Sequence, residues 1–322
     1  MNNPGTTVIR SNSLIDGKSA SPIRNAVVVL KGQLIVAVGT AEEIEVPRGP
    51  DVREIDYGDA YVLPGLIDAH THLMFGHGEG TYEEVIERDS DETMLLRAAR
   101  NAHVHLNAGV TALRDCGARN NITFDLRRGV EQGLSVAPRL LLSGRPVTMT
   151  GGHFWWCNQE ADGVDAVRKA VRQLVRDGAD FIKIMASGGG TAGTDNRLPS
   201  YTVEELRAIV DEAHSLGKPT TAHCLATQSI VNALDAGVDS IEHASFIDMS
   251  GSYKFEPRVA ERIARQGVVI SPTVQTGYRR REKLLALKER DGFLSKSEDC
   301  LLYTSDAADE RSSVDLGGRR II

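Results

Sequence analysis

Two histidines separated by one threonine end the apolar run GLIDAHTHL, residues 65–73. Because side chains alternate across a β-strand, His70 and His72 point to the same side and Thr71 points to the other. Two neutral imidazoles that converge at the end of a strand suit a borderline metal such as zinc. Taken alone, this pair is only a moderately specific signal.

Three further residues of this kind stand in later apolar strands. The predicted strands KPTTAHC and DSIEHAS end near His223 and His243, and Lys183 lies inside FIKIM. A lysine flanked by apolar residues in a buried strand is costly unless it is neutralised or paired, although a lysine at a strand end can also reach solvent. We therefore predict that four histidines and one lysine meet at one end of a set of parallel strands.

The elements that must position these residues change character at Leu63. Residues 6–62 contain β-branched runs broken by Gly, Asn and Pro, which predict short strands at hairpin spacing and a small β-sandwich element. From residue 63 on, short apolar strands alternate with amphipathic stretches at 91–109, 163–179 and 202–217. The last stretch opens with Thr202 and has Glu205 three residues later, which is a capping-box pattern.

Repeated strand-then-helix units with continuous apolar strands predict an α/β fold whose parallel sheet is buried on both faces. Seven such strands can be counted, and a helical start at residues 279–290 follows the seventh. The pattern favours a TIM-like (β/α)8 barrel truncated after about seven strands, with its catalytic groups at the carboxyl ends of the strands. A doubly wound open sheet is the alternative, but no GxGxxG turn follows the first strand.

Composition argues against several classes of protein. The net charge of −7 over 322 residues, without a basic stripe, argues against nucleic-acid binding. No apolar run reaches about 18 residues, which argues against a membrane partner, and the N-terminus lacks the pattern of a secretory signal. Four cysteines without CxxC spacing predict reduced thiols and a cytoplasmic location. We expect a small-molecule substrate, and a homo-oligomer is left open.

Together, these motifs resemble the amidohydrolase superfamily, in its imidazolonepropionase-related and Xaa-Pro-dipeptidase-like branch. The resemblance covers about residues 6–299 and is carried by PGLIDAHTHL, GVTALRDCG, TGGH, FIKIMASGGG, TAHC and SIEHA. It implies two divalent metal ions, usually zinc, with His70 and His72 on the first ion and His223 and His243 on the second. It also implies that CO₂ converts Lys183 into a carbamate that bridges both ions, and burial would favour the neutral amine which this step needs.

The resemblance also implies how catalysis is divided among residues. His153 of TGGH is similar to the family residue that hydrogen-bonds the scissile carbonyl oxygen, although it could be an ordinary loop histidine. The aromatic residues that follow, Phe154, Trp155 and Trp156, are expected either to form a substrate wall or to pack as a loop. The implied reaction is hydrolysis of a C–N bond by metal-activated water, on a dipeptide or an N-acyl amino acid.

Two alternatives to this function remain open. The first is a cyclic-amide hydrolase of the imidazolonepropionase type, because the segment HCLAT lacks the tyrosine that dipeptidase members often carry after the histidine of strand five. The second is an inactive fragment. In the family, an aspartate at the end of strand eight acts as general base, and no residue of this chain can be assigned that role.

Residues 300–322 are predicted to be a non-native tail. The blocks at 300–310 and 314–322 resemble the translation of a sequencing adapter, and a natural polar tail is the alternative. The expected parts are the N-terminal part of a composite β-sandwich at 1–62, an incomplete metal-dependent hydrolase barrel at 63–299 and this tail.

The remaining candidates have structural interpretations of similar or greater weight. Asp115 either supports the site or caps a strand end, Cys224 is expected to be a packed thiol, and the glycine-rich segment 186–196 is expected to be a mobile loop over the site rather than a phosphate cradle. Four further histidines have expected positions away from the metal ligands. His103 and His105 are expected on a helix surface and His214 near a helix C-terminus, while His77 could line the mouth of the barrel.

Overall fold

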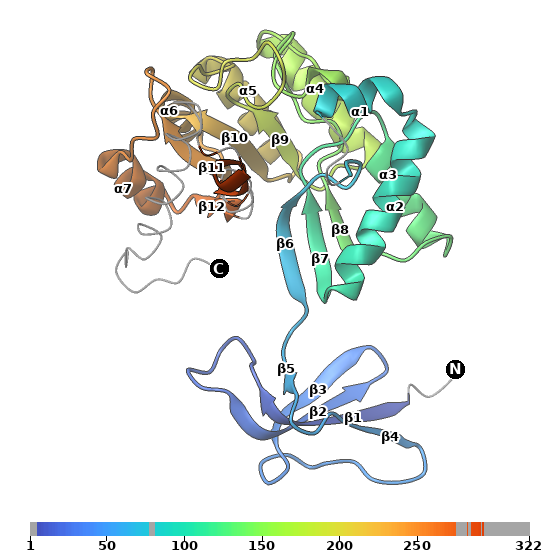
Figure 1. Ribbon diagram of the computed structural model, residues 1–322. Coiled ribbons are helices and arrows are strands. Elements are labelled where there is room, and N and C mark those ends of the chain that lie inside the picture. Colours follow the sequence, from blue (N-terminus) through green and yellow to red (C-terminus); the bar gives the residue numbers. More distant parts are fainter. Residues whose placement is uncertain (1–4, 77–80, 275–281, 283–284, 291, 293–322) are drawn as a thin grey trace. The chain divides into compact units, whose positions relative to one another are not determined.

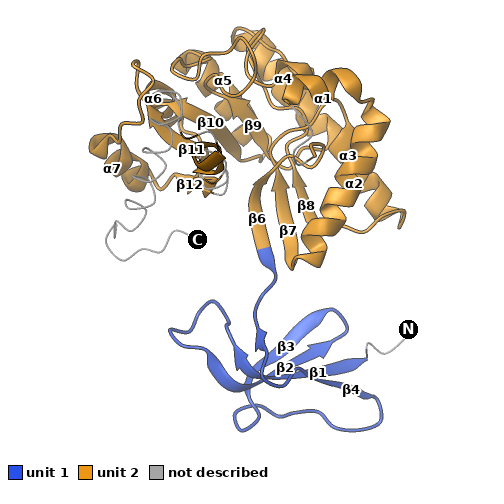
Figure 2. Ribbon diagram, viewed as in Figure 1, with its two compact units in different colours: residues 1–66 blue, residues 67–322 orange. Residues whose placement is uncertain are grey.

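The computed structural model describes residues 5–76, 81–274, 282, 285–290 and 292. The chain divides into two compact units, residues 1–66 and residues 67–322 (Figure 2). The sequence analysis placed this change between residues 62 and 63.

Unit 1 is a β-sheet in the strand order β3-β2-β1-β4, with β5 also paired to β1 (Figure 1). The strands are β1 (Thr6–Leu14), β2 (Ile23–Lys31), β3 (Leu34–Thr40), β4 (Val52–Asp56) and β5 (Tyr61–Val62). The predicted hairpin arrangement holds for the antiparallel pairs β1–β2 and β2–β3. It is wrong for β4 and β5, which run parallel to β1. A parallel partner needs a longer connection than a hairpin, and residues 41–51 provide it for β4.

Both faces of this sheet carry apolar side chains, because consecutive residues of β2 point to opposite sides and all contribute to packing. One face holds the cluster Val8, Val27 and Val29, and the other holds Leu14, Ala26 and Val28. The strand β3 differs, since among the described residues it pairs only with β2. Its residues Leu34, Ile35 and Val36 are 70%, 65% and 50% exposed.

Unit 2 contains the seven strands that the sequence predicts. Within each of its two sheets, the strands follow one another in chain order. They are β6 (Leu66–Thr71), β7 (Val110–Asp115), β8 (Arg139–Leu142), β9 (Ile182–Met185), β10 (Thr220–Ala226), β11 (Ser240–Ile247) and β12 (Val269–Ser271). They form two sheets, β6-β7-β8 and β9-β10-β11-β12, rather than one continuous sheet. Val147 joins the sheets, because its N–H donates to Lys183 O and its carbonyl accepts from Met185 N, each at 2.9 Å.

Helices cover these sheets in the alternating order that the sequence predicts (Figure 1). The helices are α1 (Tyr82–Arg88), α2 (Asp91–Asn107), α3 (Ile122–Glu131), α4 (Val164–Asp177), α5 (Val203–Ser215), α6 (Thr227–Ala236) and α7 (Pro257–Gln266), with a short 3₁₀ helix η1 (Trp155–Cys157). Residues 285–290, within the predicted helical start, are helical as well. Among the helices described here, none combines the length and apolarity that crossing a membrane requires.

The predicted capping of α5 is confirmed in detail. The Thr202 hydroxyl accepts from the backbone N–H of Glu205, and the Glu205 carboxylate accepts from the backbone N–H of Thr202. This reciprocal pair satisfies two N–H groups that a helix start would otherwise leave free. This stretch is amphipathic as predicted, because Leu206, Ile209, Val210 and Ala213 on one side of the helix are buried. Local sequence therefore fixes where α5 begins and which side faces the sheet.

Candidate active site

The four histidines of the predicted constellation lie together: His70 and His72 at the carboxyl end of β6, His223 inside β10 and His243 inside β11. The ring centroids of His70 and His72 are 5.2 Å apart, those of His70 and His243 are 5.0 Å apart, and those of His223 and His243 are 4.6 Å apart. Lys183, on β9 beside β10, acts electrostatically on all four rings. The predicted grouping of the histidines is therefore confirmed, but the prediction that strands five and six end near His223 and His243 is wrong, because β10 continues to Ala226 and β11 to Ile247. The role of these residues as metal ligands stays a prediction.

Hydrogen bonds fix which ring nitrogen faces the centre of the cluster in the first pair. His70 Nδ1 lies 2.7 Å from Glu242 Oε2, and His72 Nδ1 lies 2.9 Å from the carbonyl oxygen of Gly117. A carboxylate and a carbonyl oxygen only accept, so both imidazoles carry their proton on Nδ1. Both therefore keep the lone pair on Nε2 for another partner, which is how a metal-binding histidine is usually oriented.

The second pair is oriented in two different ways. His243 Nδ1 lies 2.7 Å from the hydroxyl oxygen of Thr273, and that hydroxyl donates its own proton to the carbonyl of Pro272. His243 must therefore donate from Nδ1 and keep its lone pair on Nε2. His223 is reversed, because its Nε2 lies 3.3 Å from the carbonyl oxygen of Gly188 and Nδ1 is left for a ligand.

Burial keeps these rings neutral. Desolvation lowers the pKa of His70, of His72 and of His223, with the last two well below the ordinary value, and it lowers the pKa of His243 to about 2. The positive charge of Lys183 acts in the same direction on each of them. A neutral imidazole offers a lone pair, so the cluster presents four nitrogen donors rather than four cations.

Lys183 is buried in an environment that gives its amine nothing to bind. The side chain is 1% exposed, every residue of β9 is buried, and Nζ has no hydrogen-bond partner among the described residues. A buried amine without a partner is costly, so it points to a group that the protein chain alone does not supply. Together with the four imidazole lone pairs, this donor set fits metal ions held at the cluster.

Glu242, which the sequence analysis did not single out, is the central acid of the site. It is fully buried on β11 and accepts from His70, from Thr221 Oγ1 at 2.6 Å and from the Arg114 guanidinium. Burial by itself would raise the pKa of Glu242, but Lys183, His70 and Arg114 outweigh it and lower that pKa. The sequence does contain a signal for Glu242, because a buried glutamate in an apolar strand is as costly as the buried lysine Lys183.

Cys116 also lies near this acid. The ligand atoms of His70, Cys116 and Glu242 all fall within 4.8 Å of one another, which is a spacing that a metal ion could bridge. His70 and Glu242 are already joined by a hydrogen bond, however, and burial raises the pKa of the Cys116 thiol to about 12. We therefore interpret this group as a hydrogen-bonded support for His70.

Asp115 binds the backbone beside His72. Its carboxylate is fully buried and accepts from the backbone N–H of Leu73 at 2.7 Å and from that of Gly117 at 3.2 Å. The carbonyl of Gly117 in turn accepts from His72. Asp115 therefore fits both interpretations from the sequence. It is the last residue of β7, and it binds the main chain that orients the candidate ligand His72.

Asp115 is expected to make stability depend on pH in a way that Asp115→Asn removes. Burial raises its pKa to about 7, although the two N–H donors oppose this. Because the folded protein then holds the proton more tightly than the unfolded chain, its contribution is present below pH 4 and is lost as pH rises towards 7, by up to about 4 kcal/mol.

The measurement is urea unfolding of the chelator-treated protein and of Asp115→Asn between pH 4 and 8. The difference between their free energies of unfolding should change over that interval, whereas Asp165→Asn at an exposed position of α4 should track the parent. Parallel curves for parent and Asp115→Asn would contradict the assignment.

His153 lies beside the cluster and is held by the glycine-rich segment. Its ring centroid is 4.6 Å from that of His223, the residue is 5% exposed, and burial together with Lys183 lowers its pKa to about 3. Its Nδ1 lies 2.7 Å from the hydroxyl oxygen of Thr191. His153 is thus a neutral side chain next to His223, one of the predicted metal ligands.

The segment 186–196 packs on His153 through a glycine. A Cβ added to Gly189 would lie 2.5 Å from His153 Nε2, while a Cβ added to Gly190 would meet nothing closer than Tyr82 Cε2 at 3.7 Å. Internal bonds also order the segment, since Thr194 Oγ1 accepts from Gly189 N at 3.1 Å. The predicted loop therefore lies against the site, and Gly189 keeps space beside His153.

Gly189→Ala is expected to reduce kcat/KM by about 100-fold, because the added methyl group must displace the His153 ring and a misplacement of 1 Å can cost that much. Gly190→Ala is the matched control and should stay near the parent value. Steady-state kinetics of both variants, with circular dichroism to verify folding, test this. Equal activity of the two variants would show that the position of His153 does not matter.

The three consecutive aromatic residues are placed differently from one another. Trp156 is 3% exposed and stacks with Phe154, Phe75 and Tyr82, with ring centroids 4.3, 5.5 and 6.2 Å away. Phe154 also lies 4.8 Å from His72, whereas Trp155 is 44% exposed. Trp156 thus packs in an aromatic cluster that borders the site, which resembles the packed-loop alternative more than an open wall.

The remaining candidate residues from the sequence do not join the histidine cluster. Cys224 is the predicted packed thiol, and His214 is exposed and pairs with Asp239 at 2.8 Å. His103 is exposed as predicted, and His105 is partly exposed, with its Nε2 3.3 Å from the carboxylate of Asp68, so both histidines lie at the helix surface. A helix surface can face a neighbouring strand, which spacing alone does not reveal. His77 and the tail at 300–322 lie outside the described residues.

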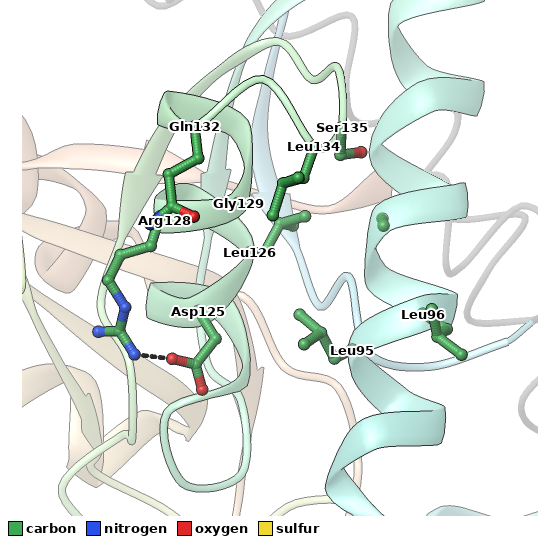
Figure 3. A pocket seen from close by; sticks show the side chains of 10 residues that line it. Leu95, Leu96, Asp125, Leu126, Arg128, Gly129, Gln132, Leu134 and Ser135 are labelled. Atoms are coloured by element: carbon green, nitrogen blue, oxygen red, sulfur yellow. Dashed lines mark hydrogen bonds and ion pairs between the residues drawn. The ribbon is translucent and has the colours of Figure 1, made fainter.

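A surface cavity of about 400 Å³ lies elsewhere, between α2, α3 and the segment that follows α3 (Figure 3). Its lining is mainly apolar, and its charged residues Asp125 and Arg128 pair with each other. None of the candidate catalytic residues lines it. We place the functional site at the histidine cluster, because buried polar groups of matched chemistry converge there.

Comparison with known proteins identifies the family. The profile of the Amidohydrolase family matches residues 61–306, which is most of the chain. The chain belongs to the amidohydrolase family. The match includes residues 300–306, which the sequence analysis assigned to the tail.

Several amidohydrolases resemble this chain in sequence. An ochratoxinase of Aspergillus niger is 30% identical over 271 residues, covering 75% of this chain and 55% of that protein. An imidazolonepropionase of Chloroflexus aggregans is 25% identical over 272 residues, covering 72% of this chain and 60% of that protein. This amidohydrolase chain therefore spans little more than half the length of these relatives.

Solved amidohydrolase structures resemble it in fold. A Xaa-Pro dipeptidase with bound methionine superposes with a TM-score of 0.75 at 26% identity, covering 94% of this chain and 73% of that one. The A. niger ochratoxinase structure superposes with a TM-score of 0.77 at 26% identity, covering 95% and 73%. These neighbours imply that the two parallel sheets of this amidohydrolase belong to a TIM-like barrel.

Proposed function

We propose that the whole protein is a metal-dependent hydrolase of C–N bonds, acting on the amide or peptide-like bond of a small molecule. The observation that carries this proposal is the buried amine of Lys183, which has no partner among the described residues and lies beside four neutral imidazoles. Membership of the amidohydrolase family supports the same reaction class.

His70 and His72 would hold one divalent ion, and His223 and His243 would hold a second. Lys183, carboxylated by CO₂, would bridge them. Zinc suits this donor set best, because imidazole nitrogen is one of its preferred ligands. When bound, such ions supply Lewis-acid polarisation of a carbonyl and a nucleophile at neutral pH. Carboxylation would also give the lysine nitrogen the partner that the protein does not provide.

His153 would contact the substrate. It is neutral, it lies next to His223, and its ring packs closely against Gly189, which holds the ring in place. A donor at this position would stabilise negative charge on the scissile carbonyl oxygen, which is often the largest single contribution to catalysis. The aromatic cluster around Phe154 and Trp156 would shield this region from water.

The substrate class is proposed from the relatives. Proteins described as an ochratoxinase, a Xaa-Pro dipeptidase and an imidazolonepropionase all resemble this chain. A dipeptide or an N-acyl amino acid is the leading candidate. A cyclic amide of the imidazolonepropionase type is the second.

The proposal predicts that turnover depends on bound metal. The protein should lose at least about 99% of its activity after dialysis against a chelator and regain it with zinc, because several kcal/mol of catalysis come from the ions. Assays on Xaa-Pro dipeptides, N-acyl amino acids and imidazolone compounds would separate the substrate classes, with metal content measured in parallel. Full turnover of any of these by metal-free protein would refute the proposal.

An incomplete, inactive barrel is the competing hypothesis for this chain. Among the described residues, β6 and β12 each pair with a single neighbour. That hypothesis predicts that residues 1–322 show no turnover in the same assays even when they bind zinc. A metal-loaded chain that hydrolyses one of the substrates would rule it out.

A further inference from the structure

The hydroxyl of Thr191 is the shared end point of two hydrogen bonds from the TGGH segment. It lies 2.7 Å from His153 Nδ1 and 3.1 Å from the backbone nitrogen of Phe154. Thr191 is 2% exposed, so a polar atom left unpaired there would be costly. The three groups must therefore share their protons without leaving one unmatched.

The proton of the Thr191 hydroxyl decides the direction of the bond to His153. The backbone N–H of Phe154 can only donate, so it uses the hydroxyl oxygen as its acceptor. Among the described residues, His153 Nδ1 is the one acceptor within hydrogen-bond distance of the hydroxyl. If Nδ1 carried a proton instead, the oxygen would receive two donors and its own proton would have no acceptor.

A second histidine–threonine pair in the same site shows the opposite arrangement. His243 Nδ1 also lies 2.7 Å from a threonine hydroxyl, that of Thr273, but this hydroxyl donates to the carbonyl of Pro272 at 2.8 Å. Thr273 therefore accepts from His243. The Thr191 hydroxyl contacts no such carbonyl among the described residues, so the same distance corresponds to the reverse direction.

We propose that Thr191 is a positioning residue that holds His153 in the tautomer with its proton on Nε2. This inference rests on the proposed function, in which His153 donates to the carbonyl oxygen of the substrate. The proton then sits on Nε2, and the close packing of the ring on Gly189 keeps the ring from moving out of this hydrogen bond. The candidate ligands His70 and His72 are protonated on Nδ1 by acceptor partners instead, so the partner chemistry separates ligand histidines from the donor histidine.

The backbone conformation of Phe154 brings its N–H and the His153 ring to the same hydroxyl, that of Thr191. Phe154 has a φ of 63°, which is uncommon for a residue other than glycine, and it directly follows His153. Strained backbone of this kind persists where the surroundings fix it, often at functional sites. The Thr191 hydroxyl binds the N–H of this residue and the ring of the one before it, which couples the local backbone to the ring.

The test is nitrogen NMR of the full chain, loaded with zinc and labelled with ¹⁵N-histidine. The imidazole shifts distinguish protonated from unprotonated ring nitrogens, and the His153 signals are assigned by their loss in His153→Asn. The parent and Thr191→Ser should show a protonated Nε2, and Thr191→Val should show a shift towards the other tautomer. A parent spectrum with the proton on Nδ1 would overturn the inference.

Kinetics and metal content provide the second readout. Thr191→Val should lower kcat about 10- to 100-fold, as expected when a carbonyl donor is compromised, with zinc content unchanged. Thr191→Ser, which keeps the hydroxyl, should stay within about threefold. Equal activity of Thr191→Val and Thr191→Ser would count against the proposed role. If this chain turns over no substrate, the incomplete-barrel hypothesis is favoured, while the spectrum of the parent still decides the tautomer. If Thr191→Val does not fold, the parent spectrum and Thr191→Ser decide alone.

Discussion

Replacing Lys183 by alanine should reduce kcat/KM by at least about a thousandfold, which corresponds to about 4 kcal/mol of transition-state stabilisation. Lys183 is the group that would bridge the two ions, and its Nζ has no hydrogen-bond partner among the described residues. The variant should also bind less zinc than the parent. Lys169→Ala, at an exposed position of α4, should change neither property.

Added small carboxylates should partly restore the activity of Lys183→Ala. Formate or acetate would fit the space left by the side chain and would supply the two oxygens that a carboxylated lysine carries. The measurement is kcat/KM against carboxylate concentration, with zinc content determined by atomic emission. Parent-like activity of Lys183→Ala without any additive would show that the lysine is a structural residue, and the two-metal proposal would lose its main support.

Replacing Glu242 by leucine should destabilise the protein by about 3–5 kcal/mol, because truncating one member of a buried charge network leaves the others uncompensated. Glu242 is fully buried and accepts from His70, Thr221 and Arg114. Without it, the guanidinium of Arg114 would lose its carboxylate partner, and the charge of Lys183, which acts on Glu242, would lose its anion.

Urea unfolding of Glu242→Leu, Glu242→Gln and the exposed-site control Glu87→Leu would measure this effect. The glutamine variant keeps an acceptor for Thr221 and should lose less stability than the leucine variant, while the control should match the parent. Should Glu242→Leu fail to fold, the glutamine variant still decides the matter through its stability and zinc affinity. A leucine variant as stable as the parent would mean that Arg114 and Lys183 find other partners.

The ligand-type residues could be predicted because their signals are local. Alternation along β6 places His70 and His72 on one side, and an apolar strand makes Lys183 conspicuous. The strand order then brings the strand ends together, as the ring distances show. The helices were predictable for the same reason, since capping residues and apolar periodicity act within a few residues of each other.

The supporting residues could not be predicted because their contacts span the fold. Arg114 on β7 meets Glu242 on β11 across 128 residues of sequence, and Thr191 reaches His153 from a separate loop. No local pattern encodes these partnerships. The prediction for β4 was wrong for a different reason. Hairpins are the usual connection between short strands, so an antiparallel neighbour was expected, but β4 pairs parallel to β1.

The outer strand of unit 1 has a practical consequence for handling the protein. Leu34, Ile35 and Val36 combine exposed apolar side chains with backbone N–H and C=O groups that β2 can satisfy on one side only. Such a border can recruit the same strand of another molecule, which is a common route to oligomers and fibrils. Purified material is thus expected to self-associate as concentration rises, and a lysine at position 35 would be the simplest way to keep samples monodisperse for the assays above.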